Sequence, residues 1–565
     1  MGFSDDVTPS LVFQTLPNEL VGAICALLCN RNIKSLRLTC RALGDKSPLE
    51  FDRVFISPNP RNVEVLLSVA DHSVFRHRVK EIIWDDSVLM RIPSIDGDGP
   101  CGYSADENNP DDYAANEDKE WISRDFVRLC KQSISLTKGR LREKNRYQGE
   151  SNAVQEQVNN LMPSRDSLAY YTDLFYQQRE VLLSGADEEA FQYALQQFPH
   201  LTKITVTPAA HGFLFMPLYK TPMIRAFPSG FVYPIPRAWP SDETLGYGYP
   251  EDCPEGWEND DERRQWRGFC IVSKVLADYA ERGKLQITEL VVDNHKLPTG
   301  IDYTLFDKPN TEYDSLCKIV ARPGFRRIVL SLTTGYRPNF NAEDWEIYRN
   351  GRISSLLAKA PDLEEIVLQT NYDLTAWSCP IEDHISLFDV FPIENLSSGK
   401  LKHFGLSGMQ VSQHDLISFL GKLPQTLKSV NLSFLALVQG QGNHATMLAD
   451  IRDKLDWRHR PASQRIKVSI SMILNQFNKG RYICLDKEVQ EYIYGAGPCP
   501  FIAREGRTDA HFAFGTGVVY DEFDPSFAIP YETNRIQICC RLAAIALSLG
   551  CCRTESSAIS YVRTF

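Results

Sequence analysis

One apolar pattern recurs along most of the chain: an apolar residue, two variable residues, an apolar residue, one variable residue and a third apolar residue. Copies begin at Val79, Leu201, Ile287, Phe325, Leu363, Leu401 and Leu427, and a weaker last copy is Val468–Ile470, with Arg465 in its first position. The alternation that closes each copy is typical of a β-strand with one buried face. From Ile287 through Phe325 and Leu363 to Leu401 the starts are 38 residues apart, and equal spacing of this kind indicates a repeat array.

Helical stretches precede most of these predicted strands. They cover residues 188–198, 269–281, 313–321, 342–360, 414–423 and 446–457. Proline often marks the turn between helix and strand, as at Pro199 and Pro361. Strand and helix in alternation predict an α/β protein whose strands run parallel, because each helix carries the chain back to the start of the next strand. A generic α/β domain without true repeats is the alternative interpretation.

The N-terminal segment has a different pattern, with more apolar positions than short helices can bury among themselves. Pro17 stands where a helix begins, and its missing N–H costs nothing there. Leu20, Ile24, Leu27 and Leu28 then form one apolar stripe with the spacing of a helix. Two helices of about ten residues each are marginal by themselves. The segment therefore predicts contact with the rest of the chain or with another protein.

A polar break at 30–32 separates this stripe from a second predicted helix. That helix is expected to carry Ile33, Leu36, Cys40 and Leu43, with Leu38 on a different side. After it, Phe51–Ser57 has the composition of a strand.

In order and spacing, these N-terminal residues resemble an F-box of the fungal type. The family's motif is three helices in about fifty residues, and the resemblance implies docking on the adaptor Skp1, which links the F-box to a cullin-RING ubiquitin ligase. The positions that match the family's docking residues are Leu16, Pro17, Leu20, Ile24, Leu27, Leu28, Leu36, Leu38, Cys40 and Leu43. The family more often has a tryptophan near the last of these. The structural alternative is that the leucines belong to an internal core.

The body resembles the divergent leucine-rich repeats found in F-box proteins. Its helix, turn and Leu-x-x-Leu-x-Leu strand correspond to that family's unit, although only Asn294 and Asn371 stand where regular repeats place an asparagine after the strand. The expected fold class is therefore α/β: a small N-terminal three-helix F-box followed by an irregular leucine-rich-repeat-like solenoid, or horseshoe. The expected domains are the F-box at 11–57, a substrate-binding repeat domain at 58–470 with insertions at about 94–182 and 227–264, and a C-terminal cap and tail at 471–565.

The insertions and the tail have their own signals. Ser94–Glu120 is an acidic loop by composition, and Trp121–Leu182 has a helical pattern with a basic stretch at Lys138–Arg146. We interpret that stretch as a solvated helix face, with a functional basic patch as the alternative. Near the C-terminus, 481–486 predicts a strand, 488–495 a short helix, and Gly515–Pro530 a loop.

Composition restricts the class of partner. The formal net charge is −11 and the pI about 5.6, which argues against a nucleic-acid-binding surface. Residues 1–10 lack the features of a signal peptide, so the 15 cysteines are expected to be reduced thiols. We expect a cytoplasmic or nuclear protein without membrane partners; the most apolar run, Ile536–Cys552, contains Arg541 and predicts a packed or amphipathic helix.

No catalytic motif is recognisable, and neither a metal nor a cofactor is expected. The sequence contains no Gly-x-x-x-x-Gly-Lys-Ser/Thr loop, no His-Glu-x-x-His and no Gly-x-Ser-x-Gly. The F-box resemblance thus implies a non-enzymatic subunit that holds Skp1 and recruits an unknown protein substrate for ubiquitination. A scaffold that binds Skp1 or another partner without ubiquitin transfer is the alternative, and an enzyme on an α/β body is a further one. Arg326, Arg327 and Arg337 are weak candidates for reading a phosphorylated substrate.

Overall fold

The computed structural model describes residues 16–25, 27–28, 30–47, 49, 51–91, 124–149, 152–236, 239–240, 257, 263–337, 342–371, 385–438, 440–474, 479–502 and 515–531. The expected acidic loop at Ser94–Glu120, most of the second insertion and the apolar run Ile536–Cys552 lie wholly or largely outside these residues.

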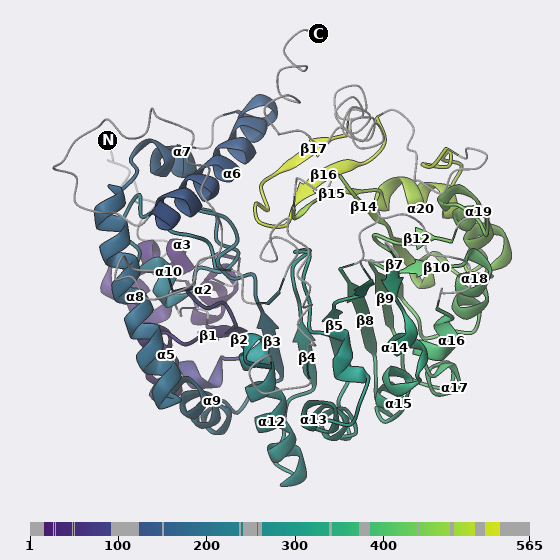
Figure 1. The fold of residues 1–565 in the computed structure, drawn as a ribbon, viewed down its shortest axis with the longest axis horizontal. Helices are drawn as coiled ribbons and strands as arrows, with labels where there is room; N and C mark the ends of the chain where they lie inside the picture. Colours follow the sequence, from purple (N-terminus) through teal and green to yellow (C-terminus); the bar gives the residue numbers. More distant parts are fainter. Residues whose placement is uncertain are drawn as a thin grey trace, which may run out of the picture.

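A nine-stranded parallel sheet forms the centre of the molecule, and its strands are ordered as they occur along the chain (Figure 1). The strands are β1 (Arg53–Ile56), β2 (Glu81–Asp85), β3 (Lys203–Thr207), β4 (Glu289–Val292), β5 (Arg327–Leu332), β8 (Glu365–Thr370), β9 (His403–Ser407), β11 (Ser429–Asn431) and β13 (Lys467–Ser469). All of the strands expected from the recurring apolar pattern are present, so the prediction of a parallel α/β architecture is confirmed. The strand expected at Phe51–Ser57 is β1, at the N-terminal edge.

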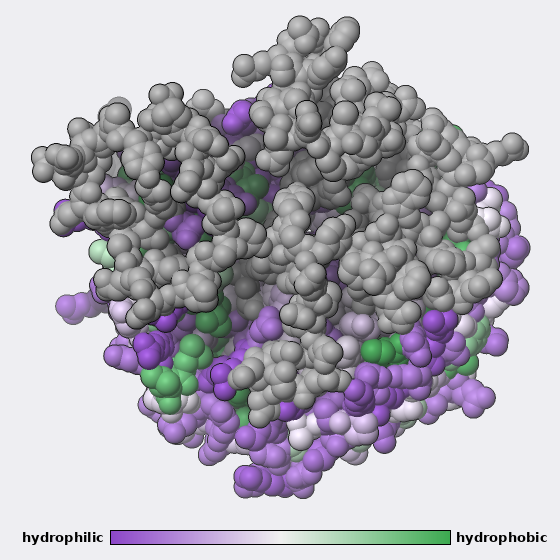
Figure 2. Space-filling view, in the orientation of Figure 1, coloured by the Kyte–Doolittle hydropathy of each residue, from purple (hydrophilic) through white to green (hydrophobic). Residues whose placement is uncertain are grey.

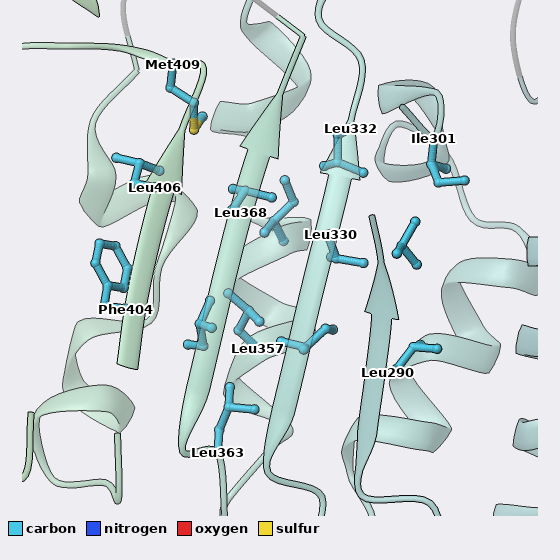
Figure 3. Packing of buried hydrophobic residues seen from close by; sticks show 14 of the residues in the cluster. Leu290, Ile301, Leu330, Leu332, Leu357, Leu363, Leu368, Phe404, Leu406 and Met409 are labelled. Carbon is cyan, nitrogen blue, oxygen red and sulfur yellow. The ribbon is translucent and has the colours of Figure 1, made fainter. Parts of the chain in front are cut away.

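The register explains the pattern in the sequence. The middle apolar position of every copy pairs with the same position of its neighbours, in an unbroken ladder of Val54, Ile82, Ile204, Leu290, Ile328, Ile366, Phe404, Val430 and Val468. Each of these side chains is buried. Figure 3 shows part of this packing, with Leu290, Leu330, Leu368 and Phe404 on successive strands. The spacing of apolar residues along the chain therefore sets one continuous buried layer.

Helices cover this apolar face and follow one another around the outer side of the sheet (Figure 1). They are α5 (Pro60–Asp71), α9 (Ala186–Gln197), α12 (Arg267–Glu281), α13 (Thr311–Val320), α14 (Glu346–Arg349), α15 (Arg352–Ala358), α16 (Leu387–Val390), α17 (Ile393–Ser397), α18 (Gln413–Gly421), α19 (His444–Lys454) and α20 (Asp486–Tyr494). Side-chain caps fix several starts: Asn59, Asn310, Ser412 and Asn443 each accept a hydrogen bond from a backbone N–H of the first turn. The coloured outer rim is mostly hydrophilic in Figure 2, as expected for amphipathic helices.

The first insertion is helical, as its pattern predicts. It contains α6 (Arg124–Gln148), α7 (Asn152–Asn159) and α8 (Ser164–Ser184), which ends at Gly185 in the left-handed conformation. The short elements α10 (Pro222–Arg225), η1 (Phe75–His77), η3 (Arg264–Trp266), η4 (Tyr303–Phe306) and η6 (Ala462–Gln464) occupy connections.

The C-terminal region is an antiparallel sheet of four strands. They are β14 (Ser471–Ile473), β15 (Arg481–Cys484), β16 (Val518–Asp521) and β17 (Ala528–Pro530). The prediction of a loop at Gly515–Pro530 is therefore wrong, because two short strands of this segment pair with β15 and with each other. Two small ladders, β10 (Gln410–Val411) with β12 (Ala436–Leu437) and β6 (Gly335–Arg337) with β7 (Ala342–Asp344), complete the described strands.

Buried charges join helix α6 to this C-terminal sheet. Asp521 on β16 accepts hydrogen bonds from Arg140 of α6 and from Arg481 of β15, and Arg481 also pairs with Glu143. Lys144 donates to Asp524 at 2.6 Å. The interpretation of Lys138–Arg146 as a solvated face is thus wrong for Arg140 and Lys144, since both point into a contact with residues almost 400 positions away.

A candidate docking surface on the N-terminal helices

Three short helices form the N-terminal unit. They are α2 (Asn18–Cys25), α3 (Asn30–Arg37) and α4 (Arg41–Lys46). Helix α2 follows Pro17 directly, as the sequence predicts. The second boundary differs from the prediction: Asn30 begins α3 instead of breaking the pattern, and the chain turns at 38–40, so Leu43 lies on a third helix with Cys40 as its N-cap.

The buried core of this unit is small. Val21, Cys25 and Ile33 are buried at its centre. Packed around them are the partly buried residues Leu16, Leu28, Leu36 and Leu49. Cys25 is a free thiol in this core. The helices are held together by a hydrogen bond from Arg37 to the Ser47 carbonyl, at 2.7 Å.

Large apolar side chains of this unit remain in solvent. Leu20 on α2 is 52% exposed, and Leu27 and Leu38, in the turns after α2 and α3, are 87% and 86% exposed. The prediction of one helical stripe through Leu20, Ile24, Leu27 and Leu28 is therefore wrong for the last two, because α2 ends at Cys25. Single exposed leucines are common, but three within nineteen residues beside so small a core are an unusual concentration of exposed apolar side chains.

The ten residues expected to dock a partner thus fall into three groups. Pro17, Leu20, Leu27 and Leu38 are exposed; Leu16, Ile24, Leu28, Leu36 and Cys40 are half-buried; and Leu43 is buried. In this structure Leu43 supports the helices from inside, whereas the four exposed residues are free to meet another molecule. The sequence pattern could not separate core positions from outward ones, because helices this short have apolar residues on several sides.

The unit is anchored to the body by a polar contact. Arg78, which follows η1, donates a hydrogen bond to the Leu49 carbonyl at 2.9 Å. This contact joins a side-chain guanidinium to a backbone carbonyl and does not involve the exposed leucines.

The arginines considered for a phosphate-reading site are already paired. Arg326 lies 2.9 Å from Glu289, and Arg327 lies 3.4 Å from Glu289 and 3.1 Å from Glu365. These contacts belong to a row of alternating charges across neighbouring strands, in which Glu81 also pairs with Lys203 at 2.9 Å. Because acidic neighbours neutralise both arginines, the geometry gives no support to phosphate binding there; the side chain of Arg337 is outside the described residues.

A pair of buried carboxylates, which the sequence pattern alone did not reveal, stands at the carboxyl end of β2. Burial raises the pKa of Asp85 and of Asp86 to about 7. Asp86 accepts hydrogen bonds from the Trp239 indole at 2.9 Å and from the Gly268 N–H at 2.7 Å, so it fastens the start of α12 to β2. Asp85 Oδ2 has no hydrogen-bond partner and lies 3.9 Å from His211 Nε2. The position of both residues at the carboxyl end of a buried parallel strand was the signal that could have found them.

Within the described ranges, no group of three or more His, Cys, Asp and Glu side chains is arranged to hold a metal ion. The described cysteines are free thiols; the vicinal pairs at 539–540 and 551–552 lie outside those ranges. Among the helices that the structure describes, none combines the length and the apolar character needed to cross a bilayer. Comparison with known proteins gives no relative: no protein-family model matches the chain, and no curated protein matches it.

Proposed function

We propose that this protein is the substrate-recruiting subunit of a Skp1–cullin–F-box ubiquitin ligase, with α2 to α4 as its F-box. The observation that carries the proposal is the exposure of Leu20 on α2 and of Leu27 and Leu38 in the turns that follow α2 and α3, in a unit that already has a core of its own. An internal core would have left these residues buried. Their exposure at positions that match the docking residues of the F-box family favours a partner over self-packing.

The body is proposed to be a divergent leucine-rich-repeat-like solenoid that holds the substrate. Its strands follow one another in chain order with a constant register, as stacked repeats do. Asn294, one of two residues at the position where regular repeats have asparagine, is buried and donates to the carbonyls of Leu297 and Thr299 at 2.9 and 2.6 Å. These hydrogen bonds from a buried asparagine side chain to the backbone of the turn after β4 support the interpretation of this segment as a leucine-rich-repeat-like unit.

The mechanism that follows is positional. The N-terminal helices hold Skp1, the body holds a protein substrate, and the ligase's conjugating enzyme then acts on the substrate at a high effective concentration. In this account the chain contributes geometry and no reacting group.

Co-purification tests the proposal with the full chain. Wild-type protein, a Leu27→Ser/Leu38→Ser variant and a Leu183→Ser control are captured in the presence of Skp1, cullin and the RING subunit. Leu183 lies on α8 and is 77% exposed, so the control removes a comparable apolar side chain from another surface.

We expect the wild type and the control to retain Skp1 and cullin, and the double variant to lose both. Equal retention of Skp1 by all three would contradict the docking assignment. Retention of Skp1 without cullin would favour a Skp1-binding scaffold that does not transfer ubiquitin.

A further inference from the structure

A lysine side chain lies against two aromatic rings at the carboxyl ends of the parallel strands. Lys296 follows β4, and its Nζ lies 5.0 Å from the centroid of the Phe434 ring and 4.9 Å from that of the Tyr482 ring. Phe434 follows β11, and Tyr482 is on β15 of the C-terminal sheet. Three segments distant in sequence therefore meet at the edge where ligands bind in parallel α/β proteins.

The rings form the walls of a cage. Phe434 and Tyr482 are perpendicular, with centroids 6.1 Å apart, and Tyr520 of β16 lies 6.1 Å beyond Tyr482. All three side chains are half-buried. Perpendicular aromatic faces around a cation are the arrangement by which proteins recognise ammonium groups.

Two carboxylates reinforce the preference for a cation. Burial acts to raise the pKa of Glu522, but the hydrogen bond from His295 at 3.0 Å and the charge of Lys296 hold that pKa below its ordinary value. Burial also acts to raise the pKa of Asp293. The positive charge of His295 and the hydrogen bond from its backbone N–H have the larger combined effect, so the pKa of Asp293 lies below its ordinary value. Both groups are negative at neutral pH, and the chain as a whole carries a net charge of −11.

Lys296 occupies the cage in an uncommon backbone conformation. His295 and Lys296 have φ angles of 50° and 62°, and Phe434 has 57°. Residues other than glycine seldom adopt the left-handed region, and those that do are concentrated at binding and catalytic sites. Among the described residues the Lys296 ammonium has no carboxylate within ion-pair distance, so the two rings are its main partners.

We propose that this cage, walled by Phe434 and Tyr482, binds a lysine side chain of a basic peptide segment in the substrate, and that Lys296 is a built-in occupant which the substrate displaces. The proposal rests on the substrate-recruiting function proposed above and specifies the chemistry of what is recruited. A cage that no ligand used would gain nothing from three residues in the left-handed region and a lysine that faces two rings instead of forming a direct ion pair.

Peptide binding to the full chain tests the proposal. The probe is acetyl-Gly-Ser-Lys-Ser-Gly-amide with a fluorescent label, and the matched control has norleucine in place of lysine; Kd is measured by anisotropy at physiological ionic strength. We expect the Lys296→Ala variant to bind the lysine peptide at least tenfold more tightly than the wild type does. Adding Tyr482→Leu should return the affinity to the wild-type level or below, and the norleucine peptide should bind none of the proteins. Equal affinity of the wild type and Lys296→Ala, or binding that survives Tyr482→Leu, would overturn the proposal.

A second measurement needs no variant. Acetylation of Lys296 by a water-soluble ester is followed by mass spectrometry in the wild type, with and without saturating lysine peptide. Lys422, which lies 4.5 Å from the Phe388 ring elsewhere on the molecule, is the internal control. Because the lysine of the peptide also consumes the ester, the rate at Lys296 is expressed relative to the rate at Lys422. Displacement predicts that this ratio rises several-fold with peptide, and an unchanged ratio contradicts it. Loss of peptide binding with Skp1 capture intact refutes only the cage, and loss of Skp1 capture with peptide binding intact refutes only the docking surface.

Discussion

Replacing Asp521 with asparagine should detach helix α6 from the C-terminal sheet. The Asp521 side chain is fully buried and serves two guanidinium groups, those of Arg140 and Arg481, which are themselves almost inaccessible. The variant keeps the size of the side chain and removes its charge. Two buried guanidinium groups then lack the counter-ion that they share. Glu143 remains as a partner, but it is hydrogen-bonded to Arg481 and not to Arg140.

The size of the effect follows from this burial. Removing one partner of a buried ion pair costs about 3–5 kcal/mol, whereas an exposed pair contributes less than about 1 kcal/mol. The exposed pair Lys400–Asp362, at 2.7 Å, supplies the matched control variant Asp362→Asn. At about 4 kcal/mol, the local opening constant of the α6 contact rises by roughly 1000-fold.

Hydrogen exchange measured by mass spectrometry is the suitable assay, because a chain of this size need not unfold in one step. We expect peptides from α6, β16 and β17 to lose protection in Asp521→Asn while peptides from β5 and β8 keep theirs. Asp362→Asn should change protection by less than about tenfold. If Asp521→Asn behaves like this control, the buried network does not hold the two parts together and the reasoning fails.

Two further predictions concern the body. Burial raises the pKa of Asp85 to about 7, so the folded protein keeps this carboxyl protonated up to about that pH while the unfolded chain ionises near pH 4. The contribution of Asp85 to stability therefore falls as pH rises through this window, and the contribution of Asp86 falls in the same way. Asp85→Asn should remove the share of Asp85, making the pH dependence of urea unfolding shallower and stabilising the protein at pH 8 by at most about 4 kcal/mol; an unchanged profile would contradict this. Ile366→Ala on β8 should lower the free energy of unfolding by about 2–5 kcal/mol, because the side chain is buried in the middle of the sheet. The exposed control Leu183→Ala should change this free energy by less than about 0.5 kcal/mol. Similar values for the two variants would refute the assigned ladder of buried side chains.

The parallel sheet was predictable from the sequence because each strand has its own apolar signal. Ile328, Ile366 and Phe404 stand at equal spacing, and burial on the helix-covered face requires an apolar residue at each of them. The second sheet was not predictable in the same way. Strands β16 and β17 have four and three residues, and they form through pairing with β15.

Charged residues were the least predictable part of the fold. Arg140 stands in a basic stretch whose local sequence looks like a solvated helix face. Its burial depends on Asp521, which is close only in the folded structure. At the docking surface the apolar residues were recognisable, but the division between buried Val21 and exposed Leu20 depends on how α3 and α4 cross α2, which local periodicity does not contain.

The measurement that tests the central claim most directly is the Kd of purified Skp1 for the full chain by calorimetry. Burying the side chains of Leu27 and Leu38 at an interface is worth about 3 kcal/mol in total, allowing for incomplete burial. We therefore predict that Leu27→Ser/Leu38→Ser weakens Skp1 binding by roughly 100-fold, while Leu183→Ser leaves the Kd unchanged. Absence of measurable binding to the wild type, or equal affinity for the wild type and the double variant, would contradict the account.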